Sequence, residues 1–382
     1  MSRLKIALVA GEISGDLLGG ALVRALAARL PGAQFYGVAG PRMQAAGCEA
    51  IASIEQLSVM GIAEVLPALP RILRLRRELL MRFSADRPDV VIGIDAPDFN
   101  LGLERRLREQ GIRTVHVVSP TVWAWREGRV KTIGRAVDRI LCLFPFEPAY
   151  YARRGVAADY IGHPLADELD ASVTPAQGQA ALGLAVGGPV VTVLPGSRGS
   201  ELKYLGGTFA QAARLIAAQV PGVRFVTPIA KPGLRAAMEA AIAAEAPELP
   251  WTVLDGQSRE AMRAADAVLI ASGTATLECL LLGRAMVVAY RGSPFTAWLL
   301  LTLGMLKTKY VSLPNLLSDE ATVPELLQDG ATPEALAAAV VELLGPGPAR
   351  QRQLAAFDRV RATLRCDAAL KAAEVIAGLL PR

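Results

Sequence analysis

The stretch Ala265-Asp-Ala-Val-Leu-Ile-Ala-Ser-Gly-Thr-Ala-Thr-Leu-Glu278 predicts the fold of the second half of this chain. An apolar run, a sharp turn at Ser272-Gly273-Thr274 and a helical pattern follow one another, which is typical of a strand, turn and helix in a parallel α/β sheet. The positive end of the helix dipole faces such a turn and favours an anion there. Gly273 has no Cβ, so a phosphate can approach its backbone closely. Glu278 lies one helical turn beyond Thr274, where a carboxylate can accept from both hydroxyls of a ribose.

Taken alone, this turn has low specificity, because strand–turn–helix units occur throughout α/β proteins. Glu278 can equally be a solvated residue of an ordinary helix. The interpretation as a nucleotide site therefore depends on what the same half of the chain also supplies.

A second loop of this kind precedes the first, at Pro195-Gly-Ser-Arg-Gly-Ser-Glu201. Gly196 and Ser197 permit close approach of a phosphate, and Arg198 offers a rigid fork of donors for its oxygens. Two anion-binding loops in one half predict a nucleoside diphosphate site. Gly256, in a turn between them, is expected to meet the base ring through its backbone, although it can equally be an ordinary glycine turn.

Composition indicates two domains and no membrane span. The chain has 382 residues, which is long for one core, and 52% of them are hydrophobic. No apolar run approaches the roughly 18 to 20 residues that span a bilayer, and the longest, Trp298–Leu306, is half that length. We expect no secretory signal, because the run Ile6–Ala10 leads into Gly11-Glu12 rather than into a cleavage site.

The cysteines and histidines of the sequence suggest no metal site, and the net charge does not identify a class of partner. The four cysteines stand alone without C-x-x-C spacing, which argues against zinc and disulfides and fits a reduced, cytoplasmic compartment. We expect His116 to lie in the core and His163 in a linker, and no D-x-D motif suggests a metal-bridged diphosphate. The net charge of +5 is compatible with anionic partners of several kinds.

Strands and helices alternate twice along the chain, which predicts two doubly wound parallel sheets. Strands are expected at residues 4–10, 34–38, 90–94, 114–118, 139–143, 189–194, 224–227, 251–254, 267–271 and 285–289. We therefore predict an α/β protein with two Rossmann-like domains, 1–165 and 166–355, facing across a cleft. The chain beyond 333 is expected to be helical with a break at 345–348, and a tail helix at about 360–382 is expected to rejoin the first domain.

The first strand ends in Ala10-Gly-Glu-Ile-Ser-Gly-Asp16, which is not G-x-G-x-x-G and so argues against a dinucleotide dehydrogenase. We expect Ser14 or Asp16 to cap the next helix, with capping the favoured role for Asp16. Glu12 is expected to project from the strand tip into the cleft.

Asp95 directly follows the apolar strand at 90–94, at the mouth of the predicted cleft, where a carboxylate is placed to act as a general base. Asp95 is our candidate base, with a turn-forming role as the alternative. Asp98 is interpreted as the cap of the next helix. The loop Ser119–Arg126, with two tryptophans, can line a sugar or acyl site, but packing is the favoured role for tryptophan.

Residues 66–83 predict a basic amphipathic helix. Its apolar side consists of Leu69, Ile72, Leu73, Leu75, Leu79, Leu80 and Phe83, while Arg71, Arg74, Arg77 and Arg82 fall opposite and Arg76 intrudes on the apolar side. Such a helix can lie in a membrane interface, where Leu66, Leu69, Ile72 and Leu73 are the expected contacts. An ordinary helix packed on the sheet fits the pattern equally well.

Together these stretches resemble the lipid-A-disaccharide synthase family, glycosyltransferases of the two-Rossmann (GT-B) type. The resemblance runs nearly end to end and is carried, in order, by Ala10–Asp16, Gly40–Met43, Val59–Ile62, Gly93–Asn100, Ser119–Arg126, Ile161–His163, Leu194–Arg198, Ala271–Glu278 and Tyr310–Leu317.

The resemblance implies an inverting transfer that joins UDP-2,3-diacylglucosamine to 2,3-diacylglucosamine 1-phosphate (lipid X) and releases UDP, with the UDP-sugar as substrate and no cofactor. It implies that Asp95 is the base, Arg198 the nucleotide-side arginine and Glu278 the ribose ligand, with Asn315 near the active site. The family's membrane-contact segment matches Ala63–Leu73, where Pro67 and Pro70 can break the helix early.

The resemblance further implies a peripheral location on the cytoplasmic face of the inner membrane, a possible homodimer formed by exchange of C-terminal segments, and no nucleic-acid partner. Two alternatives stay open from the residues. One is a non-hydrolysing UDP-sugar epimerase on the same two-domain plan, and the other is a non-catalytic, membrane-associated nucleotide-sugar binding protein.

Overall fold

The computed structural model describes residues 3–57, 62–125, 128–184, 187–292 and 309–380. The chain divides into two compact units, one formed by residues 1–167 together with 363–382 and the other by residues 168–362. Each unit is a parallel sheet covered by helices, so the predicted α/β class with two parallel sheets is confirmed.

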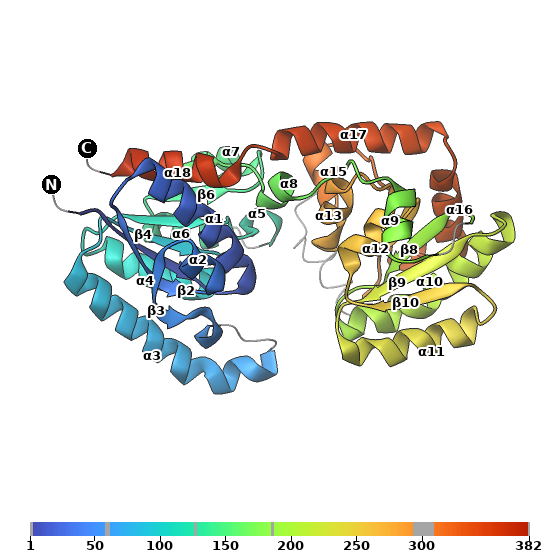
Figure 1. The fold of residues 1–382 in the computed structure, drawn as a ribbon, viewed down its shortest axis with the longest axis horizontal. Helices are drawn as coiled ribbons and strands as arrows, with labels where there is room; N and C mark the ends of the chain where they lie inside the picture. The colour runs from blue at the N-terminus through green and yellow to red at the C-terminus, as the bar shows by residue number, and fades with distance from the viewer. Residues whose placement is uncertain (1–2, 58–61, 126–127, 185–186, 293–308, 381–382) are drawn as a thin grey trace. The chain divides into compact units, whose positions relative to one another are not determined.

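The first unit contains a seven-stranded sheet in the order β3-β2-β1-β4-β5-β6-β7 (Figure 1). Its strands are β1 (Lys5–Ala10), β2 (Gln34–Ala39), β3 (Cys48–Ser53), β4 (Val90–Ile94), β5 (Thr114–Val117), β6 (Arg139–Cys142) and β7 (Ala158–Tyr160). The order reverses between β1 and β4, which pair in parallel from Ile6 with Val90 to Ala10 with Ile94. Both strands are apolar and buried because helices cover both faces of the sheet.

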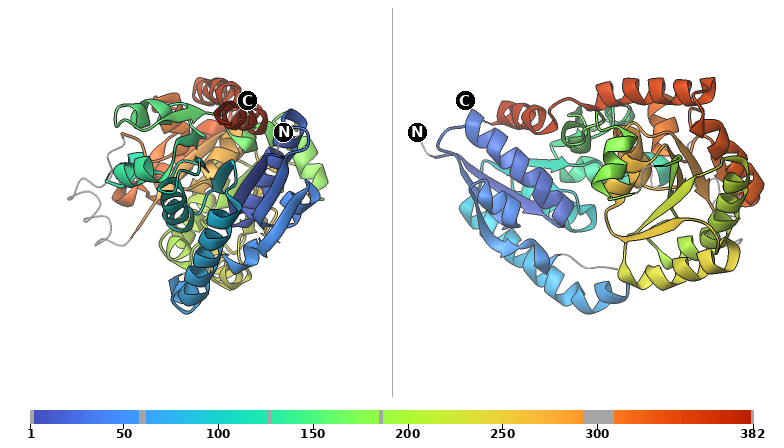
Figure 2. Two further views of the ribbon diagram at one scale, coloured as in Figure 1. Left: turned by 90° about the vertical axis from the view of Figure 1, so that its left-hand side faces the viewer. Right: turned by 45° about the vertical axis from the view of Figure 1, so that its right-hand side comes forward.

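Two helical layers cover this sheet (Figure 2). The helices are α1 (Ile13–Arg29), α2 (Pro41–Ala45), α3 (Ile62–Asp86), α4 (Pro97–Arg108), α5 (Val122–Trp125), α6 (Arg129–Ala136), α7 (Glu147–Ala152), α8 (Pro164–Glu168) and α18 (Ala368–Leu379). Helix α18, from the end of the chain, packs on α1 and buries Ala372, Ala373 and Ile376 in the core of the first unit. The C-terminal segment thus completes a core that the N-terminal residues begin.

The second unit contains a six-stranded sheet in the order β10-β9-β8-β11-β12-β13. Its strands are β8 (Val190–Leu194), β9 (Arg224–Ile229), β10 (Trp251–Asp255), β11 (Ala267–Ala271), β12 (Met286–Tyr290) and β13 (Glu325–Leu327). Its helices are α9 (Pro175–Ala181), α10 (Gly199–Gln219), α11 (Arg235–Glu245), α12 (Ser258–Ala264), α13 (Ala275–Leu281), α15 (Leu313–Ser318), α16 (Pro333–Leu344) and α17 (Pro348–Leu364). The helical end of the chain and its break at 345–348 are confirmed.

Three strands were not predicted: β3, β7 and β13. All three are the last strands at an edge of a sheet, and none is fully buried along its length. Because one side of such a strand faces solvent, its sequence lacks the continuous apolar run that identifies central strands.

Helix α3 begins at Ile62 and continues through Pro67 and Pro70, so these prolines do not break it early. Proline has no backbone N–H, so two of the hydrogen bonds within the helix are missing near its N-terminal end. Packing therefore has to hold the helix, and it does so from Leu75 onward, where Leu75, Leu79 and Phe83 are buried in the core.

Candidate functional site

The loops after β8 and β11 lie next to each other because these strands are neighbours where the strand order of the second sheet reverses. A cavity of about 320 Å³ opens at this point. The predicted nucleotide-site residues that line it are Gly196, Ser197, Arg198, Gly256, Ser272, Gly273 and Thr274. Folding thus brings together loops that are about 75 residues apart in the sequence, by the general rule that ligands bind at such reversal points.

The turn after β11 leaves open space for a ligand. Gly273 is exposed with φ +156°, and a Cβ built on it would meet nothing within 4 Å. Thr274 is the N-cap of α13. The N–H groups of Thr276 and Leu277 already donate to the carbonyls of Gly273 and Thr274, so the donors that remain for a ligand are those of Gly273, Thr274 and Ala275. These donors border the cavity and suit an anion.

The loop after β8 is organised by Glu201, a residue to which the sequence analysis gave no role. Its carboxylate accepts from the backbone N–H groups of Ser197 at 2.8 Å and Arg198 at 3.1 Å, and from the Arg198 guanidinium at 2.7 Å. A Cβ on Gly196 would lie 2.3 Å from Glu201 Oε2, so the glycine makes room for this carboxylate. Glu201 lies three residues after the helix N-cap, the spacing of a capping box, but the N-cap is Arg198 and not serine or threonine, so the sequence pattern did not reveal this role.

Glu278 is not among the residues that line this cavity. Its Oε2 accepts from Arg259 Nε at 2.6 Å, and Arg259 also donates to Glu168 Oε1 at 2.9 Å. Arg259 therefore joins two carboxylates. Because only one Glu278 oxygen is bound by Arg259, the geometry leaves the other available as an acceptor.

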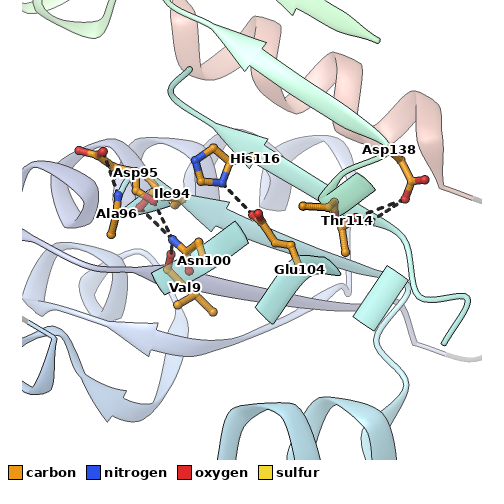
Figure 3. Close-up of polar contacts among 10 residues, drawn as sticks. Val9, Ile94, Asp95, Ala96, Asn100, Glu104, Thr114, His116 and Asp138 are labelled. Atoms are coloured by element: carbon orange, nitrogen blue, oxygen red, sulfur yellow. Dashed lines mark hydrogen bonds and ion pairs between the residues drawn. The ribbon is translucent and has the colours of Figure 1, made fainter. Parts of the chain in front are cut away.

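In the first unit, Asp95 occupies a strained turn at the carboxyl end of β4 (Figure 3). Asp95 and Ala96 have φ values of +54° and +44°, a conformation that non-glycine residues rarely adopt. One carboxylate oxygen accepts from the Ala96 backbone N–H at 2.9 Å, and the side chain is partly exposed. The predicted turn-forming role and a reactive role are therefore compatible in the same residue.

Asn100 holds this turn from beneath. Its Nδ2 donates to the carbonyls of Asp95 at 2.8 Å and of Val9 at 3.2 Å, so it links the turn to the end of β1 (Figure 3). A Cβ on Gly11 would lie 2.4 Å from the Ala96 Cβ, which shows how closely the loops after β1 and β4 approach. Glu12, the N-cap of α1, and Ser14, in the first turn of that helix, follow β1 directly, and both are exposed.

A buried polar pair lies deeper under the same sheet. Glu104 and His116 are at most 1% exposed, and His116 Nδ1 lies 2.9 Å from Glu104 Oε1. Gly93 makes room for this pair, since a Cβ there would lie 2.1 Å from Glu104 Oε1. The prediction that His116 is a core residue is confirmed. Figure 3 shows the Asp95 carboxylate pointing away from this pair.

Both predicted helix caps in the first unit were wrong. Asp16 is buried and accepts from the backbone N–H groups of Gly40, Arg42 and Met43 at 2.9–3.0 Å, so it caps α2 and not its own helix. Asp98 is exposed in the first turn of α4, whose N-cap is Ala96, and pairs with Arg129. Helix α1 starts early, with Glu12 at its N-cap and no side-chain cap, so Ser14 lies in its first turn.

Asn315 is 2% exposed and fully engaged. Its Nδ2 donates to Val323 O and Glu325 Oε1, each at 2.9 Å, and its Oδ1 accepts from Val323 N at 2.7 Å. These bonds fix the start of β13 against α15. In this geometry Asn315 shapes the structure near α13 and does not present its side chain to a ligand.

Trp123 has a packing role, as favoured from the sequence. Its ring makes edge contacts with Phe144 and Phe146, and its Nε1 donates to Glu147 Oε1 at 3.0 Å. Glu147 is 1% exposed, and this burial raises the pKa of its carboxyl to about 7. The side chains of Trp125 and Arg126 lie outside the described residues.

Helix α3 packs on the first unit along part of its apolar side and leaves another part exposed. Ile72 and Leu80 pack partly against the core, whereas Leu69 and Leu73 are more than 40% exposed. The side chain of Leu66 and the apolar stretch Trp298–Leu306 lie outside the described residues. Of the helices that the structure describes, none is long and apolar enough to cross a bilayer. No group of three or more His, Cys, Asp or Glu in the same part of the chain could hold a metal ion.

Structural comparison finds the same two-sheet fold in solved structures of distant sequence. The UDP-GlcNAc 2-epimerase of Neisseria meningitidis, solved with UDP-GlcNAc bound, is similar with a TM-score of 0.63 at 12% identity, over 98% of this chain and 99% of that one. The sucrose-phosphate synthase of Thermosynechococcus elongatus has a TM-score of 0.60 at 17% identity, over 99% of both chains. At these identities the likeness shows the shared GT-B-like fold.

Sequence comparison is far more specific. Residues 6–377 match the family model described as lipid-A-disaccharide synthetase. The lipid-A-disaccharide synthase of Pseudomonas savastanoi pv. phaseolicola is 52% identical over 377 residues, 99% of this chain and 97% of that protein. Those of Pseudomonas putida KT2440 and Chromohalobacter salexigens are 51% and 50% identical over at least 97% of each chain. The chain therefore belongs to the lipid-A-disaccharide synthase family, which are glycosyltransferases of lipid A biosynthesis.

Proposed function

We propose that this chain joins UDP-2,3-diacylglucosamine to 2,3-diacylglucosamine 1-phosphate in a single displacement with inversion at the sugar carbon. The acceptor 6-hydroxyl oxygen attacks C1 of the donor, the bond from C1 to the UDP oxygen breaks, and UDP leaves with the electron pair. The hydroxyl proton passes to Asp95, the general base. The observation that supports this role is the strained turn, which aims a partly exposed carboxylate away from the core.

Arg198 and the backbone donors of the turn at Ser272–Thr274 are proposed to stabilise the negative charge that develops on departing UDP. Arg198 is three-quarters exposed and bound to Glu201. A diphosphate that enters the cavity can replace this carboxylate as the partner of the guanidinium. No step of the proposal draws on a metal ion, because the arginine and the N–H groups supply the positive charge.

The remaining candidate residues receive roles by position. Gly196, Ser197 and Gly256 border the cavity and are proposed to contact the nucleotide, with Glu278 accepting from the ribose. Glu12 and Ser14, at the start of α1, are proposed to contact the acceptor. Asn315 is proposed to act indirectly, through the segments that it fixes. A homodimer through the C-terminal helices stays a prediction.

The variant Asp95→Ala tests the base. We expect it to bind UDP normally by calorimetry and to lose turnover by at least about 10²-fold, the usual contribution of a positioned base. Turnover close to that of the unchanged protein removes Asp95 from the role. Incubating the donor with and without the acceptor separates the alternatives, because an epimerase converts the donor alone and a binding protein yields no product.

We further propose that α3 lies on the cytoplasmic surface of the inner membrane, so that acyl chains stay in lipid while the sugars reach the catalytic residues. Leu69 and Leu73 support this, since exposed leucines one turn apart form an apolar patch that water does not favour. Changing Ile72 and Leu73 to serine is expected to reduce co-sedimentation with phosphatidylcholine vesicles. Unchanged sedimentation contradicts the membrane contact.

A further inference from the structure

A second cavity, of about 140 Å³, lies between α3 and α4 of the first unit. Its lining consists of three leucines and three arginines, namely Leu73, Leu80, Leu103, Arg76, Arg77 and Arg106. Leu103 is buried, while Leu73 belongs to the exposed apolar patch of α3. The cavity therefore has an apolar floor, a basic rim and an opening beside the proposed membrane contact.

The basic rim lacks counter-charges. Two nearby arginines are paired, Arg82 with Asp86 and Arg105 with Glu109. Within the described ranges, no carboxylate forms an ion pair with the three arginines of the cavity. Guanidinium groups gathered around one cavity without an anion repel one another, and a bound anion relieves that repulsion.

Arg76, one of these three arginines, is positioned by packing. A Cβ built on Gly102 of α4 would lie 3.0 Å from Arg76 Nη1, so the absence of a side chain at position 102 makes room for the guanidinium. Arg76 is partly buried as a result, whereas Arg77 and Arg106 stay exposed. Planar guanidinium forks of this kind match the oxygens of a phosphate.

We propose that this cavity binds the phosphate of an anionic phospholipid headgroup. The inference rests on the membrane contact proposed above, because Leu69 and Leu73 enter the acyl boundary at the same place where the guanidinium groups lie at headgroup depth. The cavity is large enough for a phosphate. The arginines thus anchor α3 and set its orientation on the surface.

Co-sedimentation of the full chain with two kinds of vesicle tests this. One kind is phosphatidylcholine alone, and the other contains one-fifth phosphatidylglycerol at equal ionic strength. The unchanged protein is expected to bind the anionic vesicles at least tenfold more tightly. Arg77→Gln with Arg106→Gln should remove most of that gain, since each surface arginine contributes about fivefold.

Two further variants separate the cavity from diffuse charge. Arg71→Gln with Arg74→Gln removes the same charge from the side of α3 turned away from Leu69 and Leu73, and is expected to keep most of the gain. Gly102→Leu displaces Arg76 with no change of charge. We expect this variant to lose several-fold of the gain in affinity for the anionic vesicles.

Several outcomes contradict the headgroup site. Equal losses in the two arginine pairs, or no loss in Gly102→Leu, show that diffuse charge is responsible. Equal binding to both vesicles removes the headgroup site and leaves the membrane contact standing, whereas no binding to either removes both. The double variant Arg77→Gln with Arg106→Gln is also assayed in detergent micelles without phospholipid. A raised KM for the phosphorylated acceptor in that assay assigns the cavity to the acceptor and not to a phospholipid.

Discussion

At the scale of single residues, Arg259 holds the side chain of Glu278, the proposed ribose-binding residue, in place before a nucleotide binds. It binds one oxygen of Glu278 and reaches Glu168 on its other side. A carboxylate held in this way has fewer rotamers to lose when a ribose binds to its second oxygen. Arg259 is therefore a positioning residue for the proposed nucleotide site.

Replacing Arg259 with glutamine is expected to raise the KM for the UDP-sugar about tenfold while kcat changes less, because the lost order affects donor binding. Steady-state kinetics with saturating acceptor measures this. Arg235→Gln is a matched control, since Arg235 is similarly exposed and also joins two carboxylates, Glu239 and Asp255, neither of which is a candidate ligand. An unchanged KM for the donor in Arg259→Gln contradicts the positioning role.

At the scale of elements, the sequence predicted the strands and the structure revised the caps. Central strands such as β4 and β11 are buried on both faces, so their apolar runs identify them directly. Capping depends on which backbone N–H groups lie nearby in space. Asp16 has the position of a first-turn residue in α1, yet the N–H groups that it reaches belong to α2, 24 to 27 residues further along.

Asp16→Asn tests this cap. The amide nitrogen that replaces one carboxylate oxygen cannot accept a hydrogen bond, so at least one backbone N–H at the start of α2 loses its partner. We expect a loss of about 1–3 kcal/mol in the free energy of unfolding by urea. Asp98→Asn is the control, because its exposed ion pair with Arg129 is worth about 0–1 kcal/mol. Equal effects of the two substitutions would show that Asp16 is no more than a surface charge.

At the scale of the whole molecule, two buried groups, Glu147 and His163, make the free energy of unfolding depend on pH, and they do so in opposite directions. Burial raises the pKa of Glu147 from 4.5 to about 7 and lowers that of His163 from 6.5 to about 4. The folded state keeps a proton on Glu147 that the unfolded chain releases, so this contribution to stability falls between pH 4.5 and 7. His163 is protonated only in the unfolded chain below pH 6.5, so its contribution rises from pH 4 to 6.5.

Comparison of the unchanged protein with Glu147→Gln isolates the carboxyl, because His163 is common to both. We expect the free energy of unfolding of the variant, relative to the unchanged protein, to increase from pH 5 to pH 8 by on the order of 3 kcal/mol. Urea unfolding at several pH values measures it. A difference that stays constant with pH shows that Glu147 titrates alike in the folded and unfolded chains.

The sequence predicted which residues line the candidate site, but it predicted only in part how other residues hold them in place. Ser272, Gly273 and Gly196 can be identified from the sequence, because small residues directly after an apolar strand permit close approach of a ligand. Glu201 and Arg259 cannot, because neither carries a signal that separates it from other charged residues on helices until its partners are known. The exposed Leu69 and the buried Leu79 likewise belong to one periodic pattern.

The sequence by itself determined the two parallel sheets, the alternation of elements and the family, because apolar periodicity and ordered motifs are local properties of the chain. Only the tertiary structure decided that β8 and β11 are neighbours, that Asp16 caps another helix, and that Arg259 joins Glu278 to Glu168. Each of these depends on contacts between segments far apart in the chain. Such contacts depend on how buried surfaces and backbone donors are matched in space, which local patterns do not record.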